Sequence, residues 1–370
     1  MPGDEDRINC MNITLFISSL YGGGAERVTC NLASYLAEKG HQVEILTMAE
    51  TDKRYPLNSK VSVSTLLKER ERRGSLYNTI SRIINLKKYM KQHKEKNAYI
   101  VMLPKTIIMM LAMRHVTKAK IIASERVDPA IYSVLEAKAL RSLAHRADGY
   151  VFQTQEAMEW YGFSVSSCIT EVIPNAINPE FICHRYDGER KKEIVAAGRL
   201  TDQKNFVLLI EAFSLIAGKY PEYSLTIYGE GECRSTLENK IEDLGLSTRI
   251  SLPGNTPNLR DMMQNASMFV LSSDYEGMPN ALMEAMALGL PCVSTDCPCG
   301  GPHFLIQDGE NGLLVPVRDY QKMAEAMESI LSDPALSEKL GKNAVLISER
   351  LNPKKIYGKW EKLILDVINN

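Results

Sequence analysis

The chain has 370 residues, of which 45% are apolar and 24% charged, and its formal net charge is −1. This length exceeds one ordinary hydrophobic core and predicts a globular protein of two domains. The balanced charge excludes a strongly basic nucleic-acid binder, so no nucleic-acid partner is expected. The eight cysteines form no Cys-x-x-Cys pair, which indicates neither a zinc site nor a disulfide framework and fits a reducing cytoplasm.

The first half of the chain alternates short apolar runs with helical patterns. It begins with an expected strand at 13–17, glycines at 22–24 and an expected helix at 25–39. Such alternation predicts a parallel sheet with helices on both faces. The further expected strands are 42–47, 61–66, 99–103, 120–124 and 149–154, and the further helices are 76–94, 106–116 and 134–146.

The second half repeats this pattern after a polar segment at 174–190, which we expect to be the interdomain linker. We predict an α/β protein of the GT-B type, with two Rossmann-like, doubly wound domains facing each other across a cleft. The expected domains are 11–180, 190–350 and a helical end piece at 351–370 that packs back on the first domain. The strands expected in the second domain are 194–197, 224–228, 249–252, 268–271 and 292–295, with helices at 206–217, 234–244, 259–266 and 281–288.

Two glutamates, Glu276 and Glu284, are separated by seven residues in the motif Glu-Gly-Met-Pro-Asn-Ala-Leu-Met-Glu. The motif follows a buried strand and opens a short helix, with Pro279 expected in its first turn and Gly289 at its left-handed stop. The N–H groups at a helix start suit a diphosphate, and nearby carboxylates accept hydrogen bonds from sugar hydroxyls. The layout indicates a nucleotide-sugar transferase. The alternative is an ordinary helix with an acidic first turn.

Two cations follow the first strand of the second domain, in the segment Gly198-Arg-Leu-Thr-Asp-Gln-Lys-Asn205. Arg199 offers a bidentate fork to phosphate oxygens, and Lys204 adds a point charge at a helix start. Together they would stabilise the negative charge that grows on a diphosphate leaving group. The alternative is a solvated turn capped by Asp202 or Asn205.

In their order and spacing, these motifs resemble the retaining glycosyltransferases of the GT-B class, in the family numbered four, over nearly the whole chain. The segment from Asp296 to Pro302 resembles the subgroup that assembles bacterial exopolysaccharides and lipid-linked oligosaccharides. The other matching segments are Gly22-Gly-Gly-Ala-Glu-Arg27, Ser124-Glu-Arg-Val-Asp-Pro129, Pro174-Asn-Ala-Ile-Asn178, Gly229-Glu-Gly231 and Asn311-Gly-Leu-Leu-Val-Pro316.

The resemblance implies transfer of a sugar from a nucleotide-sugar donor to a hydroxyl of a glycan acceptor. The expected donor is a UDP-sugar, and the expected acceptor is a lipid-linked glycan. It implies no cofactor and no metal, since no Asp-x-Asp cluster stands at a matching position. The implied catalytic residues are Arg199 and Lys204, on the diphosphate, and Glu276, on the transferred sugar. The implied donor-binding residues are Gly23, Gly24, Gly277, Met278, Pro279, Asn280 and, on the ribose, Glu284.

The chain departs from the family pattern at two positions. Many relatives have a histidine where this chain has Arg126. A positive charge at this position would favour contact with an anionic acceptor or with the donor phosphate. Glu125 is then a second candidate for contact with the substrate. The alternative is a cap pair of Arg126 and Asp128 at a helix start. His303 stands where relatives often carry an acidic residue, and the alternatives there are a general base or a surface histidine.

The segment 68–96 is basic and contains a helix with Ile83, Ile84, Leu86 and Met90. One interpretation is a surface that docks on anionic lipid, which would make this cytoplasmic protein peripheral on the inner face of the plasma membrane. The other is a solvated helix whose apolar side faces the sheet. Two alternative functions stay open: a catalytically silent scaffold, and a nucleotide-sugar epimerase of the same fold.

Overall fold

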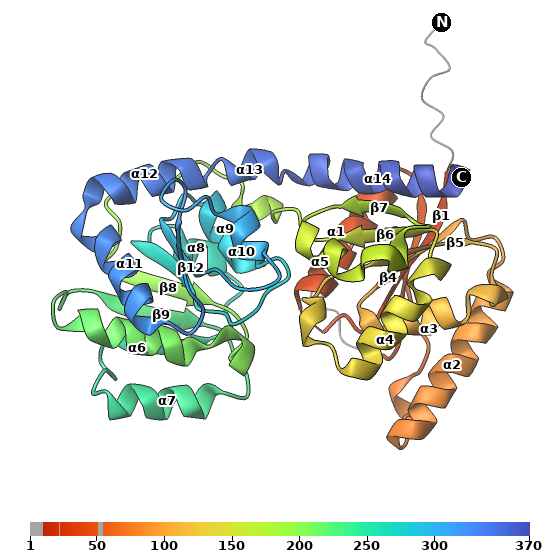
Figure 1. Ribbon diagram of the computed structural model, residues 1–370, viewed down its shortest axis with the longest axis horizontal. Helices are drawn as coiled ribbons and strands as arrows, with labels where there is room; N and C mark the ends of the chain where they lie inside the picture. Colours follow the sequence, from red (N-terminus) through yellow and green to blue (C-terminus); the bar gives the residue numbers. More distant parts are fainter. Residues whose placement is uncertain (1–9, 22, 51–54) are drawn as a thin grey trace, which may run out of the picture. The chain divides into compact units, whose positions relative to one another are not determined.

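The computed structural model describes residues 10–21, 23–50 and 55–370, which form two compact units (Figure 1). Unit 1 comprises the chain up to Pro174 together with Lys354–Asn370, and unit 2 comprises Asn175–Pro353. Gly22, part of the expected glycine loop, lies outside the described residues. Each unit has one parallel sheet with helices connecting its strands, so the predicted α/β class is confirmed.

Unit 1 contains a seven-stranded sheet in the order β3-β2-β1-β4-β5-β6-β7, with every pair of neighbours parallel. Its central strands are nearly continuous apolar runs, as expected for a sheet covered on both faces. The strands are β1 (Asn12–Ile17), β2 (Gln42–Thr47), β3 (Ser62–Thr65), β4 (Ala98–Met102), β5 (Lys120–Ser124), β6 (Gly149–Phe152) and β7 (Ile169–Val172). The helices are α1 (Gly24–Glu38), α2 (Ser75–Gln92), α3 (Pro104–Ala112), α4 (Val134–Leu143) and α5 (Gln155–Tyr161).

The last helix of the chain, α14 (Pro353–Asn369), packs on unit 1 although unit 2 precedes it in sequence. Trp360 is completely buried there. The rings of Tyr357 and Tyr35 lie 5.3 Å apart, and the Tyr35 hydroxyl donates to Glu361 at 3.2 Å. Burial and this carboxylate raise the pKa of Tyr35 to about 12. The final helix is therefore a core element of unit 1.

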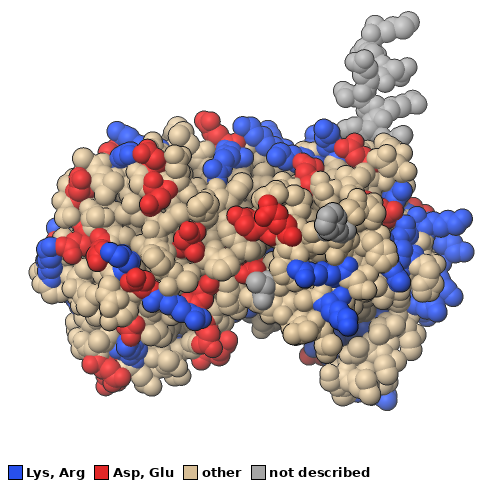
Figure 2. All heavy atoms as spheres, viewed as in Figure 1, with Lys and Arg blue, Asp and Glu red and all other residues tan. Residues whose placement is uncertain are grey.

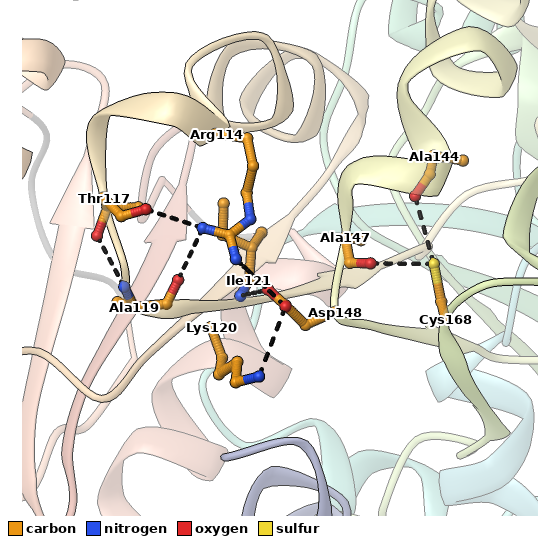
Figure 3. A network of polar contacts seen from close by, with 9 residues as sticks. All are labelled: Arg114, Thr117, Ala119, Lys120, Ile121, Ala144, Ala147, Asp148 and Cys168. Atoms are coloured by element: carbon orange, nitrogen blue, oxygen red, sulfur yellow. Dashed lines mark hydrogen bonds and ion pairs between the residues drawn. The ribbon is translucent and has the colours of Figure 1, made fainter. Parts of the chain in front are cut away.

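Asp148, just before β6, ties together the amino ends of neighbouring strands in unit 1 (Figure 3). Its carboxylate accepts from Arg114 Nη2 at 3.1 Å and from the N–H of Ile121 at 2.8 Å, and Lys120 Nζ lies 3.8 Å away. Arg114 also donates to two carbonyls of the turn that leads into β5. This network stabilises the edge opposite the carboxyl ends of the strands, where ligands bind in such sheets.

Unit 2 contains a six-stranded parallel sheet in the order β10-β9-β8-β11-β12-β13. In sequence order this is 3-2-1-4-5-6, the arrangement of a doubly wound nucleotide-binding domain, with its switch point between β8 and β11. The strands are β8 (Glu193–Ala197), β9 (Ser224–Tyr228), β10 (Ile250–Gly254), β11 (Met268–Leu271), β12 (Cys292–Thr295) and β13 (Leu313–Val315). The helices are α6 (Phe206–Ala217), α7 (Arg234–Asp243), α8 (Leu259–Met263), α9 (Asn280–Ala287), α10 (Gly301–Leu305), α11 (Tyr320–Ser332), α12 (Pro334–Ala344) and α13 (Ile347–Arg350).

The sequence pattern predicts most of these elements but no strand at β7 or β13 and no helix at α5 or α10 to α13. β7 and β13 are short strands at sheet edges, and most of their side chains are only partly buried, so they lack a long apolar run. Throughout the described ranges, no helix combines the length and hydropathy needed to cross a bilayer.

Candidate functional site

Arg199, Lys204 and Glu276, three of the residues predicted for unit 2, lie on loops at one edge of its sheet. Because the strands are parallel, their carboxyl ends meet at that edge, and the loops after β8 and β11 flank the switch point. Glu276 N donates to the Pro298 carbonyl at 2.7 Å and Cys299 N donates to the Glu276 carbonyl at 2.9 Å, which joins two of these loops. The loops are 198–205 after β8, 229–233 after β9, 272–279 after β11 and 296–300 after β12.

Two glycines allow the loops after β8 and β9 to touch. Gly229 has φ +146°, and a Cβ there would lie 1.8 Å from the Gly198 carbonyl oxygen. A Cβ on Gly231 would lie 2.2 Å from the carbonyl oxygen of Leu200. The Leu200 N–H also donates across this contact, at 2.9 Å, to the carbonyl of the residue between the two glycines. The glycine segment therefore fixes the backbone on both sides of Arg199.

Arg199 itself is exposed. No described residue forms a hydrogen bond or an ion pair with its guanidinium. Its backbone is held by the glycine contact at the carboxyl edge of the sheet. A fixed backbone with an exposed guanidinium suits the binding of an external anion.

Lys204 and Glu276, predicted separately, form an ion pair in unit 2. Lys204 Nζ donates to Glu276 Oε1, and this oxygen also accepts from Ser273 Oγ at 2.7 Å. Glu276 is 6% exposed and the Lys204 side chain 17% exposed. Since the two residues belong to the loops after β8 and β11, their pairing connects both sides of the switch point.

Further polar contacts hold the backbone beside Lys204. Asn205 has φ +43°, a left-handed conformation that Asn tolerates better than most residues, and its Nδ2 donates to Asp274 Oδ1 at 2.8 Å. Arg318 donates to the other oxygen of Asp274 from Nε and Nη2, at 2.9 and 2.8 Å. Ser272 Oγ donates to the Lys204 carbonyl at 2.8 Å. Lys204 thus stands on a loop that is braced from β11.

The Glu284 helix, α9, begins at Asn280, and the prediction that Pro279 lies in its first turn is wrong. Pro279 is the N-cap, in extended conformation with ψ 99°, which places it one residue before the helix. Glu284 is 3% exposed and lies one turn inside. A Cβ on Gly301 would lie 2.0 Å from the Gly277 carbonyl oxygen, so the loop before α9 packs directly on the start of α10. The adjacent Met278 and Asn280 are buried and half-buried.

The candidate glycines of unit 1 stand at the start of α1. Gly23 is the N-cap, in extended conformation, and Gly24 is the first helical residue and exposed. The Arg27 N–H donates to the Gly23 carbonyl at 3.1 Å, which closes the first turn. Contact of this loop with phosphates stays a prediction.

Glu125 follows β5 in unit 1 and is 1% exposed. Its carboxylate accepts from the Arg126 N–H at 3.0 Å, from the Tyr132 hydroxyl and, at 2.6 Å, from the Tyr161 hydroxyl. Burial raises the pKa of Glu125, and these donors only partly oppose it. Both carboxylate oxygens of Glu125 therefore accept hydrogen bonds from residues of unit 1.

Arg126 lies beneath α14 and is 7% exposed. Its Nε donates to Ser124 Oγ at 2.8 Å, and its guanidinium carbon lies 5.1 Å from the ring centroid of Trp360. Burial lowers the pKa of Arg126 to about 10. His303, the other departure from the family pattern, has a side chain that is 68% exposed, with Nδ1 3.5 Å from an oxygen of Asp296.

Ser273, Asp274 and Arg318 also belong to this site but were not predicted from the sequence. A signal for the first two was present, since they follow the buried run of β11 directly. Arg318 carried no comparable signal, because it lies beyond β13, an edge strand that was not predicted.

Two family models match the chain. Residues 22–181 match Glycosyltransferase Family 4, and residues 186–346 match Glycosyl transferases group 1. The chain is 29% identical over 374 residues to the "GalNAc-alpha-(1->4)-GalNAc-alpha-(1->3)-diNAcBac-PP-undecaprenol alpha-1,4-N-acetyl-D-galactosaminyltransferase" of Campylobacter jejuni, covering 97% of this chain and 99% of that protein. It is 34% identical over 225 residues to an exopolysaccharide phosphotransferase of Streptomyces coelicolor, covering 60% of this chain but only 24% of that longer protein.

Among solved structures, HepE from Anabaena in complex with UDP has the same fold, with a TM-score of 0.80 at 16% identity over 96% of this chain and 100% of that chain. The two family matches adjoin and together span both parallel-sheet units. The chain therefore belongs to glycosyltransferase family 4 and has the GT-B fold.

Proposed function

We propose that this protein transfers a sugar from a UDP-sugar to a hydroxyl of a lipid-linked glycan, with retention of the anomeric configuration, in the assembly of a bacterial polysaccharide. The observation that carries the proposal is the gathering of Arg199, Lys204 and Glu276 at the switch point of unit 2. UDP as the nucleotide is supported by the UDP complex of the Anabaena protein. A lipid-linked acceptor is supported by the undecaprenol compound in the name of the Campylobacter relative.

In this proposal Arg199 and Lys204 bind the donor diphosphate. The Lys204 ammonium has three N–H donors, and one of them reaches Glu276, so the same group can contact phosphate oxygens. Glu276 Oε1 has two donors, and we assign Oε2 to a hydroxyl of the transferred sugar. Glu284 would bind the ribose. The backbone at 277–280 would approach the sugar and phosphates, as would that of Gly23 and Gly24 in unit 1.

The reaction exchanges one bond at the anomeric carbon for another. The bond from this carbon to the diphosphate oxygen breaks, the acceptor oxygen bonds to the same face, and the acceptor proton passes to the departing diphosphate. No protein nucleophile is required. Preorganised positive charge at Arg199 and Lys204 would stabilise the leaving group, and for this reason we expect activity to be independent of metal ions.

The test measures release of nucleoside diphosphate from UDP-, GDP- and ADP-sugars, with and without an extract of lipid-linked glycans. We expect acceptor-stimulated release from a UDP-sugar that persists in EDTA, and an α-linked product by NMR from an α-linked donor. Arg199→Ala should lower kcat about a hundredfold or more. The matched control is Lys192→Ala, because Lys192 is a 55% exposed cation at the other end of β8.

Each alternative function gives a different result in this assay. Binding of donors without acceptor-stimulated release would favour a silent scaffold. Conversion of the sugar while it stays joined to its nucleotide would identify an epimerase. Equal kcat in Arg199→Ala and Lys192→Ala would remove Arg199 from the catalytic machinery.

A further inference from the structure

The first turns of α2 present an apolar stripe to solvent. Leu76, Ile80, Ile83 and Ile84 are 76%, 48%, 41% and 59% exposed, and Tyr77 beside them is 44% exposed. Their spacing of three and four residues places the aliphatic side chains on one side of the helix. A surface helix normally turns polar residues outward and its apolar stripe toward the core. In the first half of α2 the apolar side chains lie in solvent instead, as do the polar residues Ser75 and Thr79.

Residues in the second half of α2 attach the helix to unit 1. Leu86 and Met90 are 0% and 1% exposed, and the Tyr89 hydroxyl donates at 2.6 Å to a carboxylate of β2. The expectation that the apolar side of this helix faces the sheet therefore holds for Leu86 and Met90. It is wrong for Ile83 and Ile84, so the outer stripe is not part of the core that stabilises unit 1.

Basic side chains accompany the stripe. Residues 68–96 contain ten Lys or Arg and three Glu, a net charge of +7 in a chain whose total is −1. Lys87, Lys88 and Lys91 are exposed and continue the outer side of α2 toward its end. Figure 2 shows Lys and Arg gathered along the edge of unit 1 where α2 lies in Figure 1, while the lower end of this helix is mostly uncharged.

We propose that α2 docks unit 1 on an anionic lipid bilayer, with the stripe in the acyl-chain boundary and the lysines at the phosphate headgroups. A bilayer offers an apolar layer beneath a charged layer, which matches an apolar stripe continued by lysines. A nucleic acid would neutralise the lysines but leave the stripe in water. The inference deepens the proposed function, because it would bring the enzyme to the surface that holds a lipid-linked acceptor.

The test is cosedimentation of the full chain with vesicles of phosphatidylcholine alone and of equal parts phosphatidylcholine and phosphatidylglycerol. We expect binding to the anionic vesicles only, weakened by salt. Replacing Lys87, Lys88 and Lys91 by Gln should lower the partition coefficient about a hundredfold, since each lysine near an anionic surface contributes about fivefold. Ile80→Ser/Ile84→Ser should lower it more than tenfold.

Matched variants in unit 2 control for general changes of the surface. Leu215→Ser/Leu346→Ser removes apolar side chains of residues that are 55% and 57% exposed, and Lys322→Gln/Lys339→Gln/Lys342→Gln removes three exposed charges. Neither is expected to change vesicle binding. Absence of binding to anionic vesicles would overturn the proposal. Undiminished binding of Ile80→Ser/Ile84→Ser to anionic vesicles would also overturn it, because the surface would then bind polyanions in general through its charges alone.

Failure of this inference can be distinguished from failure of the proposed function. The α2 variants should release nucleoside diphosphate from the donor in solution at the wild-type rate, because α2 contains none of the residues assigned to the donor. Vesicle binding is measured without any donor, so its result stands even if no UDP-sugar is a substrate.

Discussion

Removal of the Lys204 ammonium should reduce both the stability of unit 2 and turnover, and the two effects can be separated. In Lys204→Met, the 6% exposed Glu276 keeps Ser273 Oγ at 2.7 Å but loses its cation. Breaking a buried pair from one side costs about 3–5 kcal/mol. We expect about 3 kcal/mol, the lower end of that range, because the Lys204 side chain is 17% exposed and water can partly replace the lost contact. In Lys204→Met/Glu276→Gln no buried charge is left alone, so about 2 kcal/mol should be recovered.

The choice of assay follows from the positions of the two tryptophans, Trp160 and Trp360, which both lie in unit 1. Tryptophan fluorescence therefore follows unit 1 and serves as an internal reference. Unfolding of unit 2 is measured by hydrogen exchange of peptides from β8 and β11 at increasing urea. The matched control is Lys240→Met/Glu211→Gln, which removes a half-exposed ion pair between two helices of unit 2. In this pair Lys240 Nζ lies 2.6 Å from Glu211 Oε1. This control should cost less than about 1 kcal/mol and leave kcat unchanged.

Turnover should fall about a hundredfold or more in both Lys204 variants, because the ammonium is proposed to bind the diphosphate in the transition state. The double variant should thus regain stability without regaining kcat. Recovery of kcat together with stability would show that Lys204 only neutralises Glu276, and would refute the roles proposed for both residues.

Three further predictions concern other parts of the structure. Gly231→Ala places a Cβ 2.2 Å from a carbonyl oxygen of the β8 loop, so it should displace Arg199 and lower kcat at least about tenfold; Gly218→Ala, with nothing within 4 Å, should not change kcat. Asp148→Asn weakens charged hydrogen bonds and should destabilise unit 1 by about 2 kcal/mol in urea, followed by tryptophan fluorescence, with kcat/KM unchanged. Glu125→Gln tests pH dependence: burial raises the pKa of this acid, so its contribution to stability is complete below its ordinary value of 4.5 and is lost as the pH rises through the folded value. The stability of Glu125→Gln relative to the wild type should therefore increase between acidic and neutral pH, and a constant difference would contradict the assignment.

The fold was predictable wherever a strand is buried on both faces. The predicted bounds of β9, β11 and β12 agree with the structure because each is a continuous apolar or β-branched run between polar turns. β7 and β13 escaped prediction because an edge strand is covered less completely and needs no such run. Pro279 was misplaced by one residue because N-cap and first-turn positions differ only in backbone conformation, which the sequence does not determine.

The sequence predicts which loops carry the residues of the site, but not which side chains contact each other. Parallel topology is enough to bring Lys204 and Glu276 to the same edge, since both follow strands of one sheet. Their direct pairing depends on side-chain conformations and on the bracing of the loop through Asn205. The burial of Arg126 could not be predicted locally, because the ring that covers it belongs to Trp360, near the far end of the chain.

The return of α14 to unit 1 has a consequence for the order in which the protein folds during synthesis. Trp360 is completely buried, and Leu363 and Ile364 are at most 2% exposed. A ribosome releases these side chains only after the whole of unit 2, whose sheet comes from one uninterrupted stretch of chain. Unit 2 can therefore fold as it emerges, whereas unit 1 keeps an uncovered apolar surface until α14 has been synthesised. The half that is synthesised first is the half that finishes folding last.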